Sequence, residues 1–168
     1  KMLFNVLAIV FIAGVFVNLN VMAQKQIPLE DFFKNPEKTY FQISPDGKYF
    51  SYTAPYEDRM NIFVQKIGSK KATRLTSETD RSIMGYYWAN NNRILYLKDD
   101  GGDENFALYG VDRNGKNLKC LTCFEGVRTT IIDDLEDIED EVIIGLNKRN
   151  PQVFDPYRLN IKTGEMEM

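Results

Sequence analysis

The chain has 168 residues, of which 43% are hydrophobic, and this is enough apolar surface for the core of one domain. Its net charge of −3 argues against a nucleic-acid-binding protein, which would present a basic face. The chain contains no histidine, so a Ser-His-Asp or Cys-His catalytic device and the usual zinc sites with histidine ligands are excluded within these residues. Lysine and glutamate bases are not excluded.

The N-terminal segment is typical of an export signal. Residues 3–17 (LFNVLAIVFIAGVFV) are an apolar stretch of signal-peptide length, and residues 21–23 (VMA) offer a cleavage site before Gln24. The alternative is an uncleaved membrane anchor, but three asparagines shorten its apolar run below the roughly 20 residues that a membrane span prefers. We predict a signal peptide at residues 1–23, a periplasmic or extracellular location, and no stable membrane anchor after cleavage.

A lead-in segment, residues 24–39, follows the predicted signal. It is expected to contain one short helix at Leu29–Lys34, because Pro28 precedes this stretch and a second proline follows it closely. From Tyr40 onward, short strands and turns alternate without a helical period. The remaining chain is therefore expected to consist of strands.

Three copies of one pattern follow one another along residues 40–168. The stretch FQISPDGKYFSY (residues 41–52) lines up with YYWANNNRILYL (residues 86–97), and NIFVQKIGS (residues 61–69) lines up with ALYGVDRNG (residues 107–115). A third copy follows, with TTIIDD, EVIIGL and PYRLNIKTGE as its strands. Each copy holds four short strands in about 45 residues, which is typical of a β-propeller blade.

The repeat predicts an all-β fold, a partial β-propeller of about three four-stranded blades at residues 40–80, 81–125 and 126–168. A sandwich of hairpins is the alternative, but it would not produce a regular period. Known propellers use about four to eight blades to close a ring, so we expect the chain to be the amino-terminal piece of a longer protein, although a trimer of such arcs would imitate one. Positive φ angles are expected at three hairpin glycines, Gly47, Gly115 and Gly164.

The stretch GGDEN, residues 101–105, lies between two strands of the second copy and is interpreted as a sharp turn. A phosphate cradle needs a glycine-rich turn that leads into a helix, whereas a strand follows here. A calcium loop needs more regularly spaced oxygen ligands than the acids of this stretch provide. Asp103, Glu104 and Asn105 remain candidates for contact with a substrate or a neighbouring domain.

Other features have both a structural and a functional interpretation. Cys120 and Cys123 have redox or metal spacing, but zinc needs a second ligand pair, so an incidental pair or a local disulfide is expected. The seven acids of residues 133–141 are expected in a solvated hairpin, with calcium or a cationic peptide as the alternative.

Trp88 is expected to pack between blades rather than stack a sugar. Arg128 is a candidate for pairing with a substrate carboxylate, although an ion pair with an acid of a neighbouring blade is the simpler use.

The stretch GGDENFALYGVDRNGKNLKCLTCFEGVR, followed by NKRNPQVFDPYRLNIKTGE, resembles the propeller of the prolyl oligopeptidase family of serine peptidases. The resemblance covers Ile27 to the C-terminus and is strongest to exported bacterial members akin to acylaminoacyl and dipeptidyl peptidases. It implies a propeller followed by an α/β-hydrolase domain with a Ser-Asp-His triad, which would lie beyond Met168. In such enzymes the propeller admits short peptides and excludes folded proteins. The resemblance therefore implies a hydrolase domain and a peptide substrate as partners, with no cofactor, no metal and no catalytic residue in this chain.

Three functional classes remain open. The first is an exported serine peptidase, represented here by its substrate-gating propeller and recognised by a downstream G-x-S-x-G and a late histidine. The second is a non-catalytic exported propeller of the TolB-like kind, a binding or assembly module that would end after further blades. The third is a propeller glycosidase such as a sialidase, whose central carboxylates and arginines the three copies do not plainly show. We favour the first on the resemblance, because the repeat alone does not separate the first two.

Overall fold

The computed structural model describes residues 26–168, and the predicted signal peptide, residues 1–23, lies outside the described residues. The chain divides after Lys34 into two units. Before that point, the short helix α2 spans Leu29–Phe33, directly after Pro28, with all of its side chains exposed. Within the described part of the chain, no helix has the length and apolar character that a membrane crossing requires.

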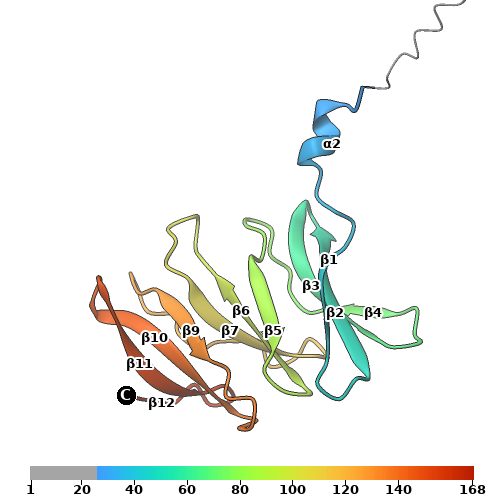
Figure 1. Ribbon diagram of the computed structural model, residues 1–168. Helices are drawn as coiled ribbons and strands as arrows, with labels where there is room; N and C mark the ends of the chain where they lie inside the picture. Colours follow the sequence, from blue (N-terminus) through green and yellow to red (C-terminus); the bar gives the residue numbers. More distant parts are fainter. Residues whose placement is uncertain (1–25) are drawn as a thin grey trace, which may run out of the picture. The chain divides into compact units, whose positions relative to one another are not determined.

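The second unit, Asn35–Met168, consists of three four-stranded antiparallel sheets, each with its strands in sequence order (Figure 1). The first sheet contains β1 (Thr39–Ile43), β2 (Tyr49–Tyr56), β3 (Arg59–Lys66) and β4 (Ala72–Arg74). The second contains β5 (Gly85–Trp88), β6 (Arg93–Lys98), β7 (Ala107–Asp112) and β8 (Lys119–Cys120). The third contains β9 (Thr129–Asp133), β10 (Glu141–Asn150), β11 (Val153–Asn160) and β12 (Met166–Glu167).

Side chains of neighbouring sheets form two apolar clusters. The first cluster joins the first two sheets and includes Ile62, Val64, Trp88 and Tyr96. The second cluster joins the second and third sheets, where fully buried leucines, isoleucines and valines of β6, β7, β10 and β11 meet. Alternating residues of one strand point to opposite faces of its sheet, so the middle sheet supplies side chains to both clusters. Sheets that stack in this way are the blades of a propeller, and the predicted fold class is confirmed.

One cross-strand pair occupies the equivalent position in each blade. The pairs are Tyr52 with Phe63, Tyr96 with Tyr109, and Ile144 with Tyr157. The second and third pairs pack onto the preceding blade within the two clusters. The first pair stacks at 5.7 Å between ring centroids on the outer face of the first blade. The alignment of residues 41–52 with 86–97 places Tyr52 opposite Leu97 instead of Tyr96, so in this strand the sequence repeat is one residue out of the structural register.

The hairpin glycines take the backbone conformation expected of them. Gly47, Gly115 and Gly164 have φ angles of 65°, 80° and 78°. A side chain at these angles is strained, which is why glycine occupies the tight hairpins. The prediction of positive φ at these three positions is confirmed.

Candidate functional site

The stretch Gly101–Asn105 is a turn between β6 and β7, as predicted. Gly101 and Gly102 have φ angles of 57° and 91°, and Glu104 has a φ of 60°. The backbone N–H of Asp103 donates to the carbonyl of Asp100 at 3.1 Å, which closes the turn. No helix begins here, so the backbone N–H groups do not form the phosphate cradle considered above.

The side chain of Asp103 is held by hydrogen bonds within the turn. Asp103 Oδ1 accepts a hydrogen bond from the Asn105 backbone at 3.0 Å, and Oδ2 accepts one from Asn105 Nδ2 at 3.0 Å. These bonds lower the pKa of Asp103 below its ordinary value, so its carboxylate is charged at neutral pH. Asp103 and Glu104 are both exposed. The turn therefore presents a fixed negative edge to solvent.

Gly102 lies against an ion pair that sequence reasoning missed. A Cβ atom at this position would lie 2.6 Å from Arg81 Nη1. Arg81 Nε lies 3.4 Å from Oδ1 of Asp99, whose side chain is only 3% exposed. The other Asp99 oxygen is buried and has no hydrogen-bond partner within residues 26–168. The only available sequence signal was the position of Asp99 directly after a strand, which does not reveal its partner.

Arg128 lies at the rim of a cleft between the second and third blades. Its guanidinium lies 5.6 Å from the centroid of the Phe106 ring, and the Thr129 N–H donates to the Phe106 carbonyl at 2.8 Å. Because Phe106 directly follows Asn105, the structure places the end of the GGDEN turn beside Arg128. No ion pair of Arg128 occurs in the described part of the chain, so the simpler use suggested from the sequence is wrong for these residues.

The cleft beside Arg128 is mostly apolar and has a volume of about 380 Å³. Tyr87 lines it, and the hydroxyl of this residue is buried without a hydrogen-bond partner among the described residues. Burial raises the pKa of Tyr86, another lining residue, to about 12, so it remains a neutral donor to the carbonyl of Tyr40 at 2.6 Å. The walls come from β5, β6 and β7 of one blade and β9 of the next: Met84, Gly85, Tyr86, Tyr87, Leu95, Tyr96, Leu97, Phe106, Leu108, Arg128, Thr129, Thr130 and Ile131.

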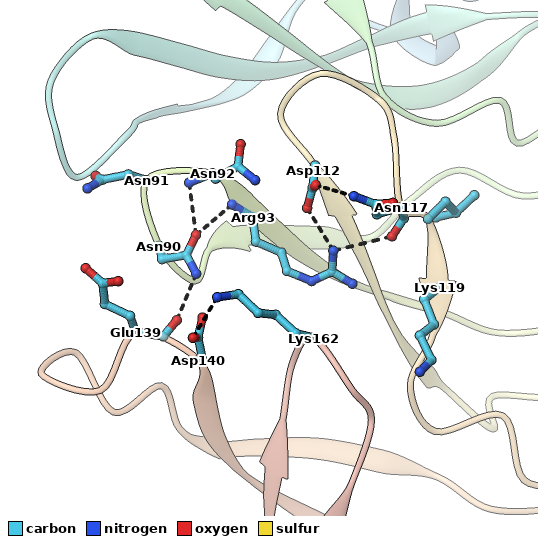
Figure 2. Close-up of a pocket in the computed structure, with 11 residues that line it drawn as sticks. Asn90, Asn91, Asn92, Arg93, Asp112, Asn117, Lys119, Glu139, Asp140 and Lys162 are labelled. Atoms are coloured by element: carbon cyan, nitrogen blue, oxygen red, sulfur yellow. Dashed lines mark hydrogen bonds and ion pairs between the residues drawn. The ribbon is translucent and has the colours of Figure 1, made fainter.

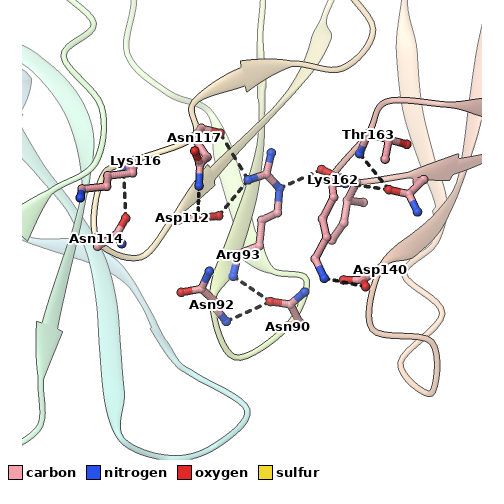
Figure 3. A network of polar contacts seen from close by, with 12 residues as sticks. Asn90, Asn92, Arg93, Asp112, Asn114, Lys116, Asn117, Asp140, Lys162 and Thr163 are labelled. Atoms are coloured by element: carbon pink, nitrogen blue, oxygen red, sulfur yellow. Dashed lines mark hydrogen bonds and ion pairs between the residues drawn. The ribbon is translucent and has the colours of Figure 1, made fainter.

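A second, polar pocket of about 650 Å³ is lined by the hairpins that join β5 to β6, β7 to β8, β9 to β10 and β11 to β12 (Figure 2). Arg93, at the start of β6, lies at its base with a side chain that is 5% exposed. Its Nη1 donates to Asp112 at 2.9 Å within the blade, and its Nε donates to the Ile161 carbonyl of the next blade at 2.8 Å (Figure 3). Nearby, Lys162 pairs with Asp140 at 2.7 Å. Most of these charges are satisfied by one another, so the pocket is mainly a polar seam between blades.

The remaining predicted features have structural uses. Cys120 and Cys123 form a local disulfide with a Cα–Cα distance of 5.8 Å. The acidic stretch 133–141 joins β9 to β10, as expected, and no cluster of three metal-ligating side chains occurs in residues 26–168. Trp88 packs between blades and donates from Nε1 to the Ser51 hydroxyl at 2.8 Å, which confirms the packing interpretation.

The sequence is similar to two curated peptidases. It is 34% identical over 140 residues to dipeptidyl aminopeptidase BIII of Pseudoxanthomonas mexicana, a match that covers 82% of this chain. The chain is similar in sequence to one part of this dipeptidyl peptidase. It is 29% identical over 150 residues to dipeptidyl peptidase family member 6 of Caenorhabditis elegans, across 84% of this chain. This chain spans about a fifth of the length of both proteins, 20% in each case. No protein-family model matches the chain.

Solved structures show the same fold at lower identity. A TolB protein of Agrobacterium tumefaciens matches 80% of this chain and 49% of its own with a TM-score of 0.54 and 22% identity. The acylaminoacyl peptidase of Pyrococcus horikoshii matches 79% of this chain and 25% of its own with a TM-score of 0.53 and 16% identity. Since both a TolB protein and a peptidase match, the fold alone does not select a function. The sequence relatives, which are dipeptidyl peptidases, confirm the resemblance inferred from the motifs.

Proposed function

We propose that this chain is the substrate-gating propeller part of an exported serine peptidase that hydrolyses short peptides. The observation that carries the proposal is the 34% identity to a dipeptidyl aminopeptidase of which the chain spans only 20%. The catalytic α/β-hydrolase domain would lie in the part of the longer polypeptide that this chain does not span. The chain itself supplies the wall of the chamber through which peptides pass.

The residues of the chain support a role in binding, with catalysis in the proposed hydrolase domain. A Ser-Asp-His triad requires an imidazole, and the chain has no histidine. The side chains nearest to the predicted contact positions are instead suited to binding: a fixed carboxylate at Asp103, a free guanidinium at Arg128 and the apolar cleft beside it. Asp103, Glu104, Asn105 and Arg128 are proposed as contacts to the substrate or to the hydrolase domain.

Export is part of the proposal and rests on the apolar residues 3–17 and on the cleavage site at residues 21–23. We infer a periplasmic or extracellular enzyme without a stable membrane anchor after cleavage. The disulfide between Cys120 and Cys123 fits an oxidising compartment.

The test is to express the complete reading frame that contains this chain, beside the 168-residue chain alone. We expect the complete polypeptide to release dipeptides from chromogenic substrates and to be inactivated by a serine-directed reagent. The 168-residue chain is expected to have no such activity. The secreted protein is expected to begin at Gln24 when its N-terminus is sequenced. A complete polypeptide that ends without a G-x-S-x-G segment and hydrolyses no peptide would contradict the peptidase proposal.

A second candidate function is a non-catalytic TolB-like binding or assembly module, which the fold match to the Agrobacterium tumefaciens protein favours. The same experiment separates the two functions. A binding module would have further blades, no activity and no reaction with the serine reagent.

A further inference from the structure

The cleft between the second and third blades combines an apolar interior with one unpaired cation. Leu95, Leu97, Leu108 and Ile131 contribute to its walls, and its volume of about 380 Å³ lies in the range of ligand sites. Arg128 lines the same cleft with an exposed side chain and forms no ion pair within residues 26–168. An apolar space with a free guanidinium at its rim is complementary to an apolar group that carries a carboxylate.

The first blade interface serves as an internal comparison for Arg128. There, the Ile83 N–H donates to the Met60 carbonyl, just as the Thr129 N–H donates to the Phe106 carbonyl in the second interface. Ser82 therefore occupies the position of Arg128. Its hydroxyl accepts a hydrogen bond from the Met60 N–H at 3.0 Å, which completes the interface with a small side chain.

The second interface has different side chains at these positions. Arg128 stands where the first interface has Ser82, and Phe106 stands where it has Met60. The Arg128 guanidinium lies over the Phe106 ring. At the first interface the guanidinium of Arg59 lies near this position, donates to the Asp80 carbonyl at 2.6 Å and is therefore satisfied within the protein. Tyr87 also lines the cleft, and its hydroxyl is buried without a partner among the described residues. The exchange of Ser82 for an unpaired Arg128 beside an apolar cleft indicates a ligand.

We propose that this cleft binds the C-terminal residue of a peptide. The apolar side chain of that residue would enter between the blades, and its carboxylate would pair with Arg128. The proposal rests on the proposed function, because that function makes a short peptide the ligand. A guanidinium presents two parallel N–H donors that match a carboxylate, and it keeps its charge at every physiological pH. The cleft thereby selects peptides with an apolar C-terminal residue.

The test uses a peptide whose two ends can be controlled. N-acetyl-Ala-Phe is titrated calorimetrically into the 168-residue chain, once with a free C-terminal carboxylate and once as the C-terminal amide. We expect the carboxylate form to bind at least about tenfold more tightly, as a hydrogen-bonded charge pair should provide. Arg128→Gln should remove this preference. Arg158→Gln, which removes a guanidinium that is 53% exposed and lies outside the cleft, should retain it.

Several results would overturn the proposal. They are equal binding of acid and amide, no binding of either, or a preference that survives Arg128→Gln. Tyr87→Phe is a second control, because it keeps the apolar wall and Arg128, so the preference for the acid should remain and its loss would contradict the assignment to Arg128. If the 168-residue chain binds the acid but the complete polypeptide binds neither form, another domain covers the cleft in the complete polypeptide. The cleft is then not a peptide-binding site, and the proposal is wrong. The readout is binding of a blocked peptide, so its failure leaves the peptidase activity of the complete polypeptide to be judged separately.

Discussion

Arg93 is a buried side chain that joins the second blade to the third through polar contacts. It is nearly fully buried. Its guanidinium donates hydrogen bonds to Asp112 in its own blade and to the Ile161 carbonyl in the next blade. Arg93→Met would leave both acceptors without their donor in a buried seam. We expect the free energy of unfolding to fall by about 3 kcal/mol, the usual cost of breaking one partner of a buried pair. Urea denaturation followed by far-UV circular dichroism measures this loss.

Arg158→Met is the matched control for Arg93. Arg158 pairs with Glu141 at 3.0 Å, but its side chain is 53% exposed, so the pair should contribute less than about 1 kcal/mol. If Arg93→Met lowers the free energy of unfolding no more than Arg158→Met does, Arg93 does not stabilise the contact between the two blades.

The turn between β6 and β7 illustrates how an element depends on one glycine. Gly102→Ala would place a methyl group 2.6 Å from Arg81 Nη1, so the guanidinium that pairs with the buried Asp99 must shift. We expect a loss of about 2 kcal/mol, because a positive φ is strained for alanine and the Arg81–Asp99 pair is weakened. Gly68→Ala is the control, because Gly68 has a φ of 82°, close to the 91° of Gly102, but open space around its Cβ, so a loss of about 1 kcal/mol is expected. Equal losses in the two variants, measured by thermal unfolding, would show that Arg81 plays no part.

The elements themselves were predictable from the sequence because their signals are local. Strand alternation and turn glycines depend on neighbouring residues, so the three blades, the positive φ at Gly47 and the turn at residues 101–105 all follow from the sequence. The contacts between blades depend on how two sheets stack. Arg93 and Ile161 are 68 residues apart, and no local pattern connects them.

The mistaken ion pair of Arg128 has the same origin. The expected partner is an acid of a neighbouring blade, and the GGDEN turn of the second blade does end beside Arg128. Asp103 of this turn accepts hydrogen bonds from Asn105 instead, an arrangement that the sequence does not reveal. The cleft beside Arg128 was not predictable either, because its walls come from four strands in two blades.

At the scale of the whole unit, Asn35–Met168, the two outer faces of the blade stack are apolar. On the first blade, Phe41 is 59% exposed and its ring lies tilted against that of Tyr52, with centroids 5.5 Å apart, and Ile43 is 68% exposed. On the third blade, Ile132 and Phe154 are 54% and 40% exposed. The pair Tyr52–Phe63 occupies the position that packs onto a preceding blade in the other two copies. Exposed apolar faces of this kind favour association.

We therefore expect the 168-residue chain to self-associate through these faces. Light scattering coupled to size-exclusion chromatography should give a mass that rises with protein concentration. Phe41→Lys should shift this equilibrium toward the monomer, because a charge in the aromatic stack would have to be buried on association. Leu118→Lys is the control, because Leu118 is 55% exposed and lies in the hairpin that lines the polar pocket. A chain that remains monomeric at every concentration, or a control that acts as strongly as Phe41→Lys, would show that the outer faces do not drive association.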